Sequence, residues 1–174
     1  MGGSIVCGID GSKDSRAAVK VAAEYADRLG SALILAHVAE PAYVPYASAY
    51  PLGGTGGPMM VIEEAESDEE AAAKLLQRIA VEAGLVDAER SVTVGHPAER
   101  LADLADEEDA DLIVVGSRGR GTLKAAFLGS VAHNLVGVAR CPVLIVPPGV
   151  AEAIEPAPMD RAPAATRGTG DRAA

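Results

Sequence analysis

The sequence predicts an α/β fold: an open, Rossmann-like parallel sheet of five strands with helices on both faces. Short runs of Val, Ile and Leu alternate along the chain with longer segments whose apolar residues recur every three or four positions. The short runs are apolar at nearly every position, which is typical of parallel strands that are buried on both faces. Strands that alternate with helices in this way connect through right-handed crossovers into one open sheet.

The first strand is expected over residues 4–10, where an apolar run ends in the turn Asp10-Gly11-Ser12. This turn needs no ligand to explain it, because Asp, Gly and Ser are common turn residues. Ser12 is also a preferred N-cap, and the helix that it starts should end at Gly30, which readily adopts the left-handed conformation of a helix end. The inward stripe of this helix consists of Ala18, Val21, Ala22, Tyr25, Ala26 and Leu29.

A second apolar run predicts a strand over residues 32–38, and a helix should follow over about 62–83. The first turns of that helix are rich in Asp and Glu, which the positive end of a helix dipole stabilises. We interpret this acidic run as a solvent-exposed face, with a buried stripe of Leu75, Leu76 and Ile79.

The second half of the chain continues the alternation. Strands are expected over residues 90–94, 111–116 and 142–147. Pro97 opens a helix after the first of these strands, at the N1 position that proline favours. The inward residues of this helix are Leu101, Leu104 and Ala105.

Two segments fall outside the pattern. Residues 41–60 contain Tyr43, Tyr46 and Tyr50, and we interpret them as a surface loop, with a lid over a ligand as the alternative. Residues 149–174 are rich in Ala, Pro, Gly and Arg and have no apolar stripe, so we expect a disordered C-terminal tail.

Composition and charge exclude several classes of function. The chain has 174 residues and a formal net charge of −10 without a lysine-rich face, which argues against a nucleic-acid partner. No apolar run approaches the roughly 18 residues of a membrane-spanning helix, and the N-terminal residues lack the pattern of a secretory signal. Cys7 and Cys141 lie in or beside apolar runs, which suits thiols in a reducing compartment. We therefore expect a cytoplasmic protein without a membrane partner.

The most informative segment follows the fourth strand. This acidic chain has no Asp or Glu over residues 112–151, and the loop after the strand carries Arg118, Arg120 and Lys124. Gly129-Ser130 then opens the next helix, where backbone N–H groups can bind an anion. Glycines, a hydroxyl and cations together favour a phosphate cradle. The alternative interpretation is a flexible connection.

Established nucleotide and metal motifs do not account for this loop. Gly116 and Gly121 have the glycine spacing of a P-loop, but Thr122 occupies the position of its lysine. The dinucleotide pattern G-x-G-x-x-G does not follow the first strand. The histidines are isolated and no Cys/His cluster occurs, so a metal site is not expected.

The spacing Gly116-x2-Gly119-x9-Gly129-Ser130 resembles the nucleotide motif of the universal stress protein family, G-x2-G-x9-G-S/T. Further segments resemble the family in the same order: CGIDGSKDSRAAVKVA, AHV, GHPAERL, ADLIVVGSRGRG and SVAHNLVGVARCPVLIVPP. The resemblance covers about residues 4–147. It implies a sheet of order 3-2-1-4-5 and a nucleotide-binding domain over residues 1–148.

The resemblance also implies an ATP site at the carboxyl ends of the strands. Asp10, followed by Gly11 and Ser12, would lie near the adenine and ribose, and the Val38 backbone would contact the adenine. The ribose and phosphates would be bound by Gly116, Arg118, Gly119, Gly129, Ser130 and Val131.

The chemistry of these residues suits such roles. We expect Gly116 and Gly119 to permit a close backbone approach and positive φ angles. Ser130 is expected to cap the last helix while it donates to a phosphate oxygen. Because the loop lacks carboxylates, Mg²⁺ that accompanies ATP would be held mainly by phosphate oxygens and water.

Three functions fit a site of this kind. The first hypothesis, which follows from the resemblance, is an ATP-binding regulator of the stress response. The second is an enzyme that hydrolyses or uses ATP, for which Ser130 and His133 are the nearby candidate groups. The third is a scaffold that has lost nucleotide binding, which the complete motif disfavours.

The fifth strand predicts a homodimer. In the order 3-2-1-4-5 it forms a sheet edge, and its residues Val143 to Val146 carry no charge. Exposed apolar edges favour pairing with another chain, and the prolines on both sides limit the length of the ladder. The same order places a strand between Cys7 and Cys141, so we expect two free thiols.

Overall fold

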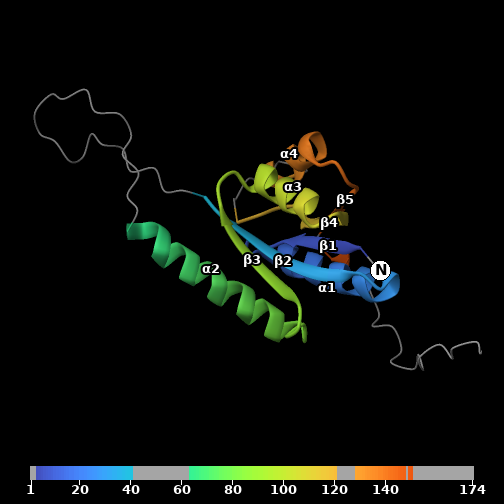
Figure 1. The fold of residues 1–174 in the computed structure, drawn as a ribbon, viewed down its shortest axis with the longest axis horizontal. Helices are drawn as coiled ribbons and strands as arrows, with labels where there is room; N and C mark the ends of the chain where they lie inside the picture. Colours follow the sequence, from blue (N-terminus) through green and yellow to red (C-terminus); the bar gives the residue numbers. More distant parts are fainter. Residues whose placement is uncertain (1–2, 41–62, 121–127, 148, 151–174) are drawn as a thin grey trace, which may run out of the picture.

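Five parallel strands form the centre of the molecule in a computed structural model that describes residues 3–40, 63–120, 128–147 and 149–150. The strands lie in the order β3-β2-β1-β4-β5, and every neighbouring pair is parallel (Figure 1). The predicted α/β fold and the strand order 3-2-1-4-5 are therefore confirmed. The strands are β1 (Ser4–Gly8), β2 (Ala32–Ala39), β3 (Glu89–Val94), β4 (Ala110–Gly116) and β5 (Val143–Val146).

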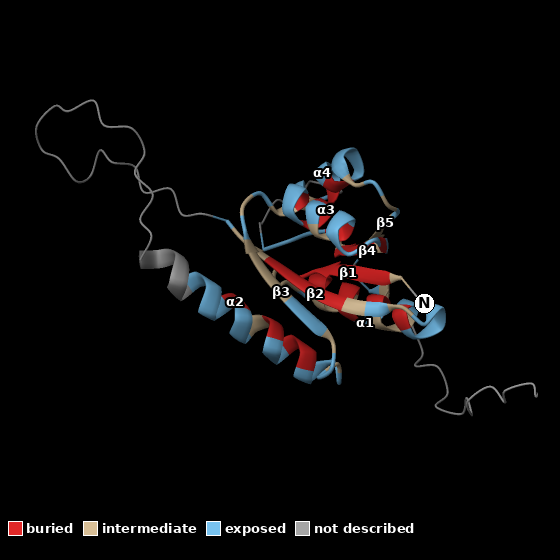
Figure 2. Cartoon of the chain, in the orientation of Figure 1, coloured by how far each residue is buried: buried red, intermediate tan, exposed pale blue. Residues whose placement is uncertain are grey.

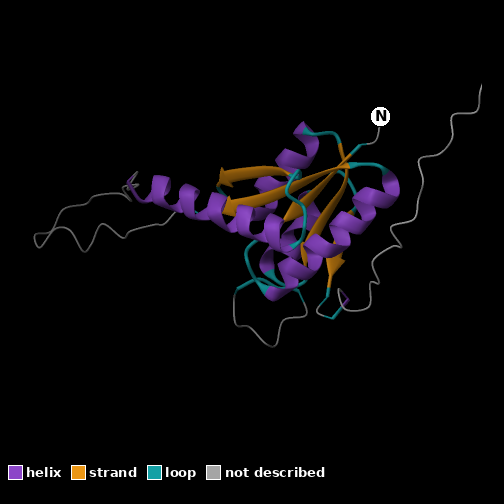
Figure 3. Cartoon of the chain, turned by 90° about the horizontal axis from the view of Figure 1, so that it is seen from below, coloured by secondary structure: helices purple, strands orange, loops and turns teal. Residues whose placement is uncertain are grey.

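Helices cover both faces of this sheet. The helices α1 (Lys13–Leu29) and α2 (Glu63–Glu82) lie on one face, and α3 (Pro97–Glu107) and α4 (Ser130–Val138) lie on the other. Figure 3 shows the strands fanning out between these helices. The sheet therefore has the two covered faces that its continuous apolar runs predict.

The central strand β1 divides the hydrophobic core into two clusters. Ile5 and Cys7 point toward α1 and α2, whereas Val6 packs with the helices of the other face. All residues of β1 are buried, as Figure 2 shows, while Glu89 and Val94 at the ends of the edge strand β3 are exposed. The carboxyl end of β1 is thus held in the middle of a rigid sheet.

The predicted helix ends are confirmed at several positions. The Ser12 side chain caps α1 by accepting a hydrogen bond from the Ser15 N–H, and Gly30 ends this helix in the left-handed conformation with φ 67°. Pro97 is the first residue of α3, as its position after a strand predicts.

Two predictions of detail were wrong. The strand β1 ends at Gly8 rather than Asp10, because the Asp10 carboxylate accepts the Ser12 N–H and belongs to the following turn. Tyr25 and Leu29 are 40% and 58% exposed instead of buried. They lie in the last turns of α1, where Ala26 is the final buried residue.

Several interpreted segments lie outside the described residues. These include the tyrosine segment 41–60, Lys124 and the tail 149–174, of which the structure describes only Gly149 and Val150. In the part of the chain that is described, no helix is both long and apolar enough to cross a bilayer.

Both cysteines are free thiols. Cys7 lies on β1, and β4 separates it from β5, which Cys141 precedes. Complete burial raises the pKa of the Cys7 thiol to about 12, so that it stays protonated and unreactive at neutral pH.

Candidate functional site

A cavity of about 830 Å³ opens at the carboxyl ends of β1, β2 and β4. This is the edge of an open parallel sheet at which ligands are expected, because the connections to either face diverge there. Most of the residues predicted for the ATP site line the cavity: Asp10, Val38, Gly116, Arg118, Gly119, Gly129, Ser130 and Val131.

The cavity has an apolar side and a polar side. Ala72 and Leu75 of α2 form one apolar wall, and Leu101 of α3 lies on the other face of the sheet. The polar side is the loop of residues 117–120 together with the start of α4. A flat apolar group with a charged extension therefore matches this arrangement.

The carboxylate of Asp10 ties two loops together. One of its oxygens accepts the Ser12 N–H at 2.9 Å, and the other accepts the Arg120 N–H at 3.1 Å. Burial alone would raise the pKa of Asp10, but hydrogen bonds from Ser12 and the nearby charge of Arg120 hold that pKa below its ordinary value. Asp10 is therefore ionised at neutral pH.

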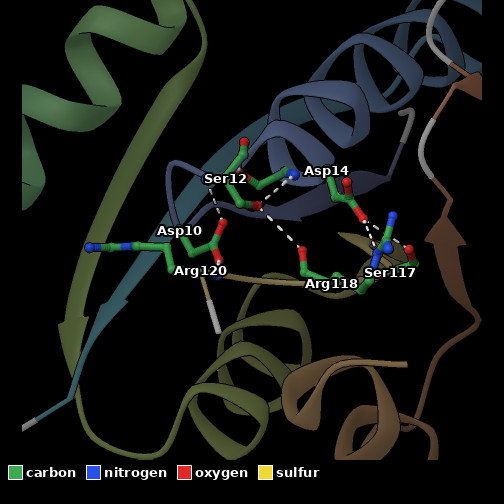
Figure 4. Close-up of polar contacts among 7 residues, drawn as sticks. Asp10, Ser12, Asp14, Ser117, Arg118 and Arg120 are labelled. Carbon is green, nitrogen blue, oxygen red and sulfur yellow. Dashed lines mark hydrogen bonds and ion pairs between the residues drawn. The ribbon is translucent and has the colours of Figure 1, made fainter. Parts of the chain in front are cut away.

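Asp14, four residues after Asp10, contacts the same loop from α1. Its residue is only 8% exposed, and Oδ2 accepts hydrogen bonds from Ser117 Oγ at 3.0 Å and Arg118 Nε at 3.3 Å. Figure 4 shows the Arg118 side chain directed at Asp14. The sequence shows no acid near Arg118, but the fold supplies one from α1.

Ser12 makes the third contact between α1 and this loop. Its hydroxyl accepts the Ser15 N–H at 3.1 Å as a helix cap and donates to the carbonyl oxygen of Arg118 at 3.3 Å (Figure 4). Gly11 between these contacts has φ 82°, which glycine adopts without strain. Gly11 and Ser12 shape the turn and do not line the cavity themselves.

The glycines of the loop provide space rather than unusual backbone angles. A Cβ atom at Gly116 would lie 2.6 Å from the backbone carbon of Asp14, and one at Gly119 would lie 2.7 Å from Asp10 Oδ2. Neither glycine has a positive φ, so that expectation was wrong. Their small size lets the loop lie against α1.

The first residues of α4, Ser130, Val131 and Ala132, line the cavity. The Gly129 N–H donates to the Ser117 carbonyl oxygen at 2.7 Å, and the first helical bond joins the His133 N–H to the Gly129 carbonyl. Ser130 is the first helical residue and not the cap, which corrects the prediction, because Gly129 has the extended cap conformation. Within the described residues, the N–H groups of Ser130, Val131 and Ala132 therefore have no partner from the helix.

Sequence reasoning missed three side chains at or near the site. Asp14 and Ser117 meet across 103 positions, so no local pattern in the sequence reveals their contact. His37 lines the cavity beside Val38 and donates its Nδ1–H to the Ile9 carbonyl at 2.6 Å. Its position at the end of β2 is the signal that could have found it.

Comparison with known proteins identifies the family. A model described as the universal stress protein family matches residues 1–147. The chain belongs to the universal stress protein family. The universal stress protein YxiE of Bacillus subtilis is 37% identical over 142 residues, which cover 79% of this chain and 94% of YxiE. The "Universal stress protein in QAH/OAS sulfhydrylase 3'region" of Thermus aquaticus is 34% identical over 144 residues, covering 82% of this chain and 97% of that protein.

Solved structures of the family share the fold. The universal stress protein UspA from Lactobacillus plantarum is 25% identical, with a TM-score of 0.64 over 83% of this chain and 97% of that chain. A universal stress protein in complex with cAMP is 31% identical, with a TM-score of 0.57 over 83% of this chain and 97% of that chain.

Proposed function

We propose that this family member is an ATP-binding regulator of the stress response. The observation that carries the proposal is the open start of α4, where the N–H groups of Ser130 and Val131 face a cavity beside the glycine loop. Such a helix end favours a phosphate through its hydrogen-bond donors and its dipole. A relative that was solved in complex with cAMP supports an adenine nucleotide as the class of ligand.

The apolar side of the cavity suits the base of the nucleotide. The Val38 backbone would contact the adenine, and Asp10 would accept hydrogen bonds from the ribose as an ionised carboxylate. Gly116 and Gly119 would lie along the ribose and phosphates, and the hydroxyl of Ser130 would donate to a phosphate oxygen.

A metal ion would depend on the nucleotide. No group of three or more His, Cys, Asp or Glu side chains that could hold a metal occurs in the described parts of the chain. Mg²⁺ that enters with ATP would therefore be bound by phosphate oxygens and water, and the protein would act on the nucleotide rather than on the ion.

An ATP-dependent enzyme is the alternative for the same cavity. It would require a base or nucleophile at the terminal phosphate, and Ser130 and His133 at the start of α4 are the nearby candidates. We expect at most weak hydrolysis, and multiple-turnover release of phosphate measures it. Sustained turnover that Ser130→Ala or His133→Ala abolishes would replace the regulator with an enzyme.

Substitutions of two glycines of α4, one at its cap and one inside the helix, test the phosphate cradle. Gly129→Val should abolish ATP binding by steric exclusion and largely keep the fold, because its φ of −70° suits any residue. Gly137→Val is the matched control, since a Cβ there meets no atom within 4 Å. Calorimetry with ATP and thermal melting compare both variants with the wild type.

Two results would contradict the proposal. Unchanged ATP affinity in Gly129→Val would contradict the assigned binding site. A wild-type protein that binds no ATP would contradict the assigned ligand. Denaturing the purified protein and identifying any released nucleotide shows which adenine nucleotide it carries from the cell.

We also propose a cytoplasmic homodimer that pairs through β5. Its residues Val143 to Val146 form a sheet edge without charge, and two free cysteines suit a reducing compartment. Antiparallel pairing of two β5 strands about a two-fold axis would satisfy both edges.

Light scattering tests the dimer on the wild-type protein, and a monomer at tens of micromolar would defeat it. Lys or Glu at Val143 and Ile145 should give monomers. Because both side chains are half-buried against the core, circular dichroism must show a retained fold. Val94→Lys on the opposite edge strand β3 is the control, and it should remain dimeric.

A further inference from the structure

Three side chains from the β1–α1 turn and the first turn of α1 contact residues 117–120. Asp10 accepts the Arg120 N–H, Ser12 donates to the Arg118 carbonyl, and Asp14 accepts from both side chains at 117 and 118. We call Asp10, Ser12 and Asp14 the loop clasp. Figure 4 shows how they face the loop from one side.

Asp14 is the most buried charged member of the loop clasp. It does not line the cavity, and its residue is 8% exposed. A charge that is so far removed from water must be paired, and its partners in the described structure are Ser117 and Arg118. Asp14 therefore fixes the side chains of two consecutive loop residues.

A chain of contacts joins Asp14 to the phosphate cradle. Asp14 holds Ser117 through its hydroxyl, and the carbonyl oxygen of Ser117 accepts the Gly129 N–H at 2.7 Å. Gly129 is the cap of α4, whose next N–H groups are open toward the cavity. Ser117 thus links Asp14 directly to the start of α4.

We propose that Asp14 is a positioning residue for the nucleotide site, acting through Ser117 and Arg118 to set the path of the glycine loop and the start of α4. It does so without touching the nucleotide. The proposal rests on the proposed function for the identity of the ligand. The positioning of the loop itself can be measured without any ligand. Arg118 in this arrangement serves as the partner of Asp14 behind the loop.

The first experiment measures the loop in the nucleotide-free full chain. Asp14→Asn keeps the shape of the side chain and removes its charge, so hydrogen exchange of the Gly129 N–H, followed by NMR, should become about tenfold faster. The Ile9 N–H, which bonds to Ala36 in the sheet, should not change. Glu24→Gln is the matched control, because Glu24 pairs with Arg28 on the same helix away from the loop.

The second experiment measures ATP affinity by calorimetry. Asp14→Asn should weaken ATP binding about tenfold, and Glu24→Gln should leave it unchanged. In a Ser117→Ala/Arg118→Gln background the same Asp14→Asn change should cost nothing or restore affinity, since it then removes an unpaired buried carboxylate. A purely structural role of Asp14 would give the same loss in both backgrounds.

The outcomes separate this proposal from the proposed function. Unchanged Gly129 exchange in Asp14→Asn overturns the positioning role, whether or not ATP binds. Faster exchange of the Gly129 N–H in Asp14→Asn, together with no ATP binding by the wild type, supports the positioning role and contradicts the proposed ligand. If Asp14→Asn does not fold, Ser117→Ala breaks the same contact from the loop side, and its Gly129 exchange decides the matter in the same way.

Discussion

The helices α1 and α4 both begin at the carboxyl edge of the sheet, yet their first turns differ. The start of α1 is closed, because Ser12 caps it and Asp14 in its first turn contacts Ser117 and Arg118. The start of α4 has a glycine as its cap, no side-chain cap and no acid in its first turn. In the described part of the chain, one helix end is satisfied by side chains of the protein, and the other is the end at which we propose that an anion binds.

This difference assigns separate tasks to two similar segments. Negative side chains at the start of α1 would repel a phosphate there, and they bind the loop instead. Ser130, Val131 and Ala132 at the start of α4 line the same cavity as Arg118, Gly119 and Arg120 of the loop. A serine at a helix start therefore serves the fold at α1, where Ser12 is the cap. At α4, Ser130 would serve the ligand under the proposed function.

The largest loss of stability is expected for a substitution at Gly116, where the chain lies against α1. Gly116→Ala would place a Cβ 2.6 Å from the Asp14 backbone, where nothing flexible can move aside. The free energy of unfolding should fall by about 3 kcal/mol. Urea denaturation measures it, with Gly137→Ala in α4 as a control that should not destabilise. A stable Gly116→Ala protein would show that the loop does not need its close approach to α1.

The next effect belongs to the open helix end. Ser130→Ala should weaken ATP binding by about 1 to 3 kcal/mol if its hydroxyl meets a charged phosphate. Because Ser130 is not the cap of α4, its loss should leave the free energy of unfolding nearly unchanged. Calorimetry and urea denaturation of the same variant test the two halves of this expectation.

The reverse pattern is expected at the closed helix end. Ser12→Ala removes the cap of α1 and should lower the free energy of unfolding by about 1 kcal/mol. Chemical denaturation of Ser12→Ala beside Ser130→Ala compares the two serines directly. Equal losses of the free energy of unfolding in the two variants would contradict the difference between the starts of α1 and α4.

The smallest effect is the pH dependence that Asp10 confers. Its pKa in the folded chain is below the unfolded value, so the folded state favours the ionised form. The resulting stability is present above the unfolded pKa and is lost as the pH falls through the folded pKa. Between about pH 5 and pH 3, Asp10→Asn should therefore lose less stability than the wild type in urea titrations. Parallel curves for the two proteins would contradict this role.

The sequence predicted the sheet well because strand burial is a local signal. Runs such as Ile5 to Cys7 are apolar at each position, and they form the buried centre of the sheet. Ser12, Gly30 and Pro97 marked helix ends because capping depends on the residue itself. Exposure of Tyr25 and Leu29 was not predictable, since periodicity does not show where a helix loses contact with the sheet.

The site was predictable in its residue types but not in its contacts. The glycine spacing indicated a loop at the right edge of the sheet, and the cavity lies there. The close approach expected at Gly116 and Gly119 is confirmed and the positive φ angles were wrong, but the partners Asp14 and Asp10 are about a hundred positions away in the sequence and were not predicted. Local pattern carries no information about which distant atom fills the space beside a glycine.

The walls of the cavity come from both layers of the molecule. Leu75 belongs to the layer of α1 and α2, and Leu101 belongs to the layer of α3 and α4 on the other face of the sheet. A nucleotide bound in this cavity, as proposed, would contact both layers and would bind only the folded chain. Each tenfold rise of free ligand above its dissociation constant then adds about 1.4 kcal/mol to the free energy of unfolding. Under the proposed function, resistance to proteases in the cell would therefore rise and fall with the nucleotide supply, and the lifetime of the protein would follow the energy state.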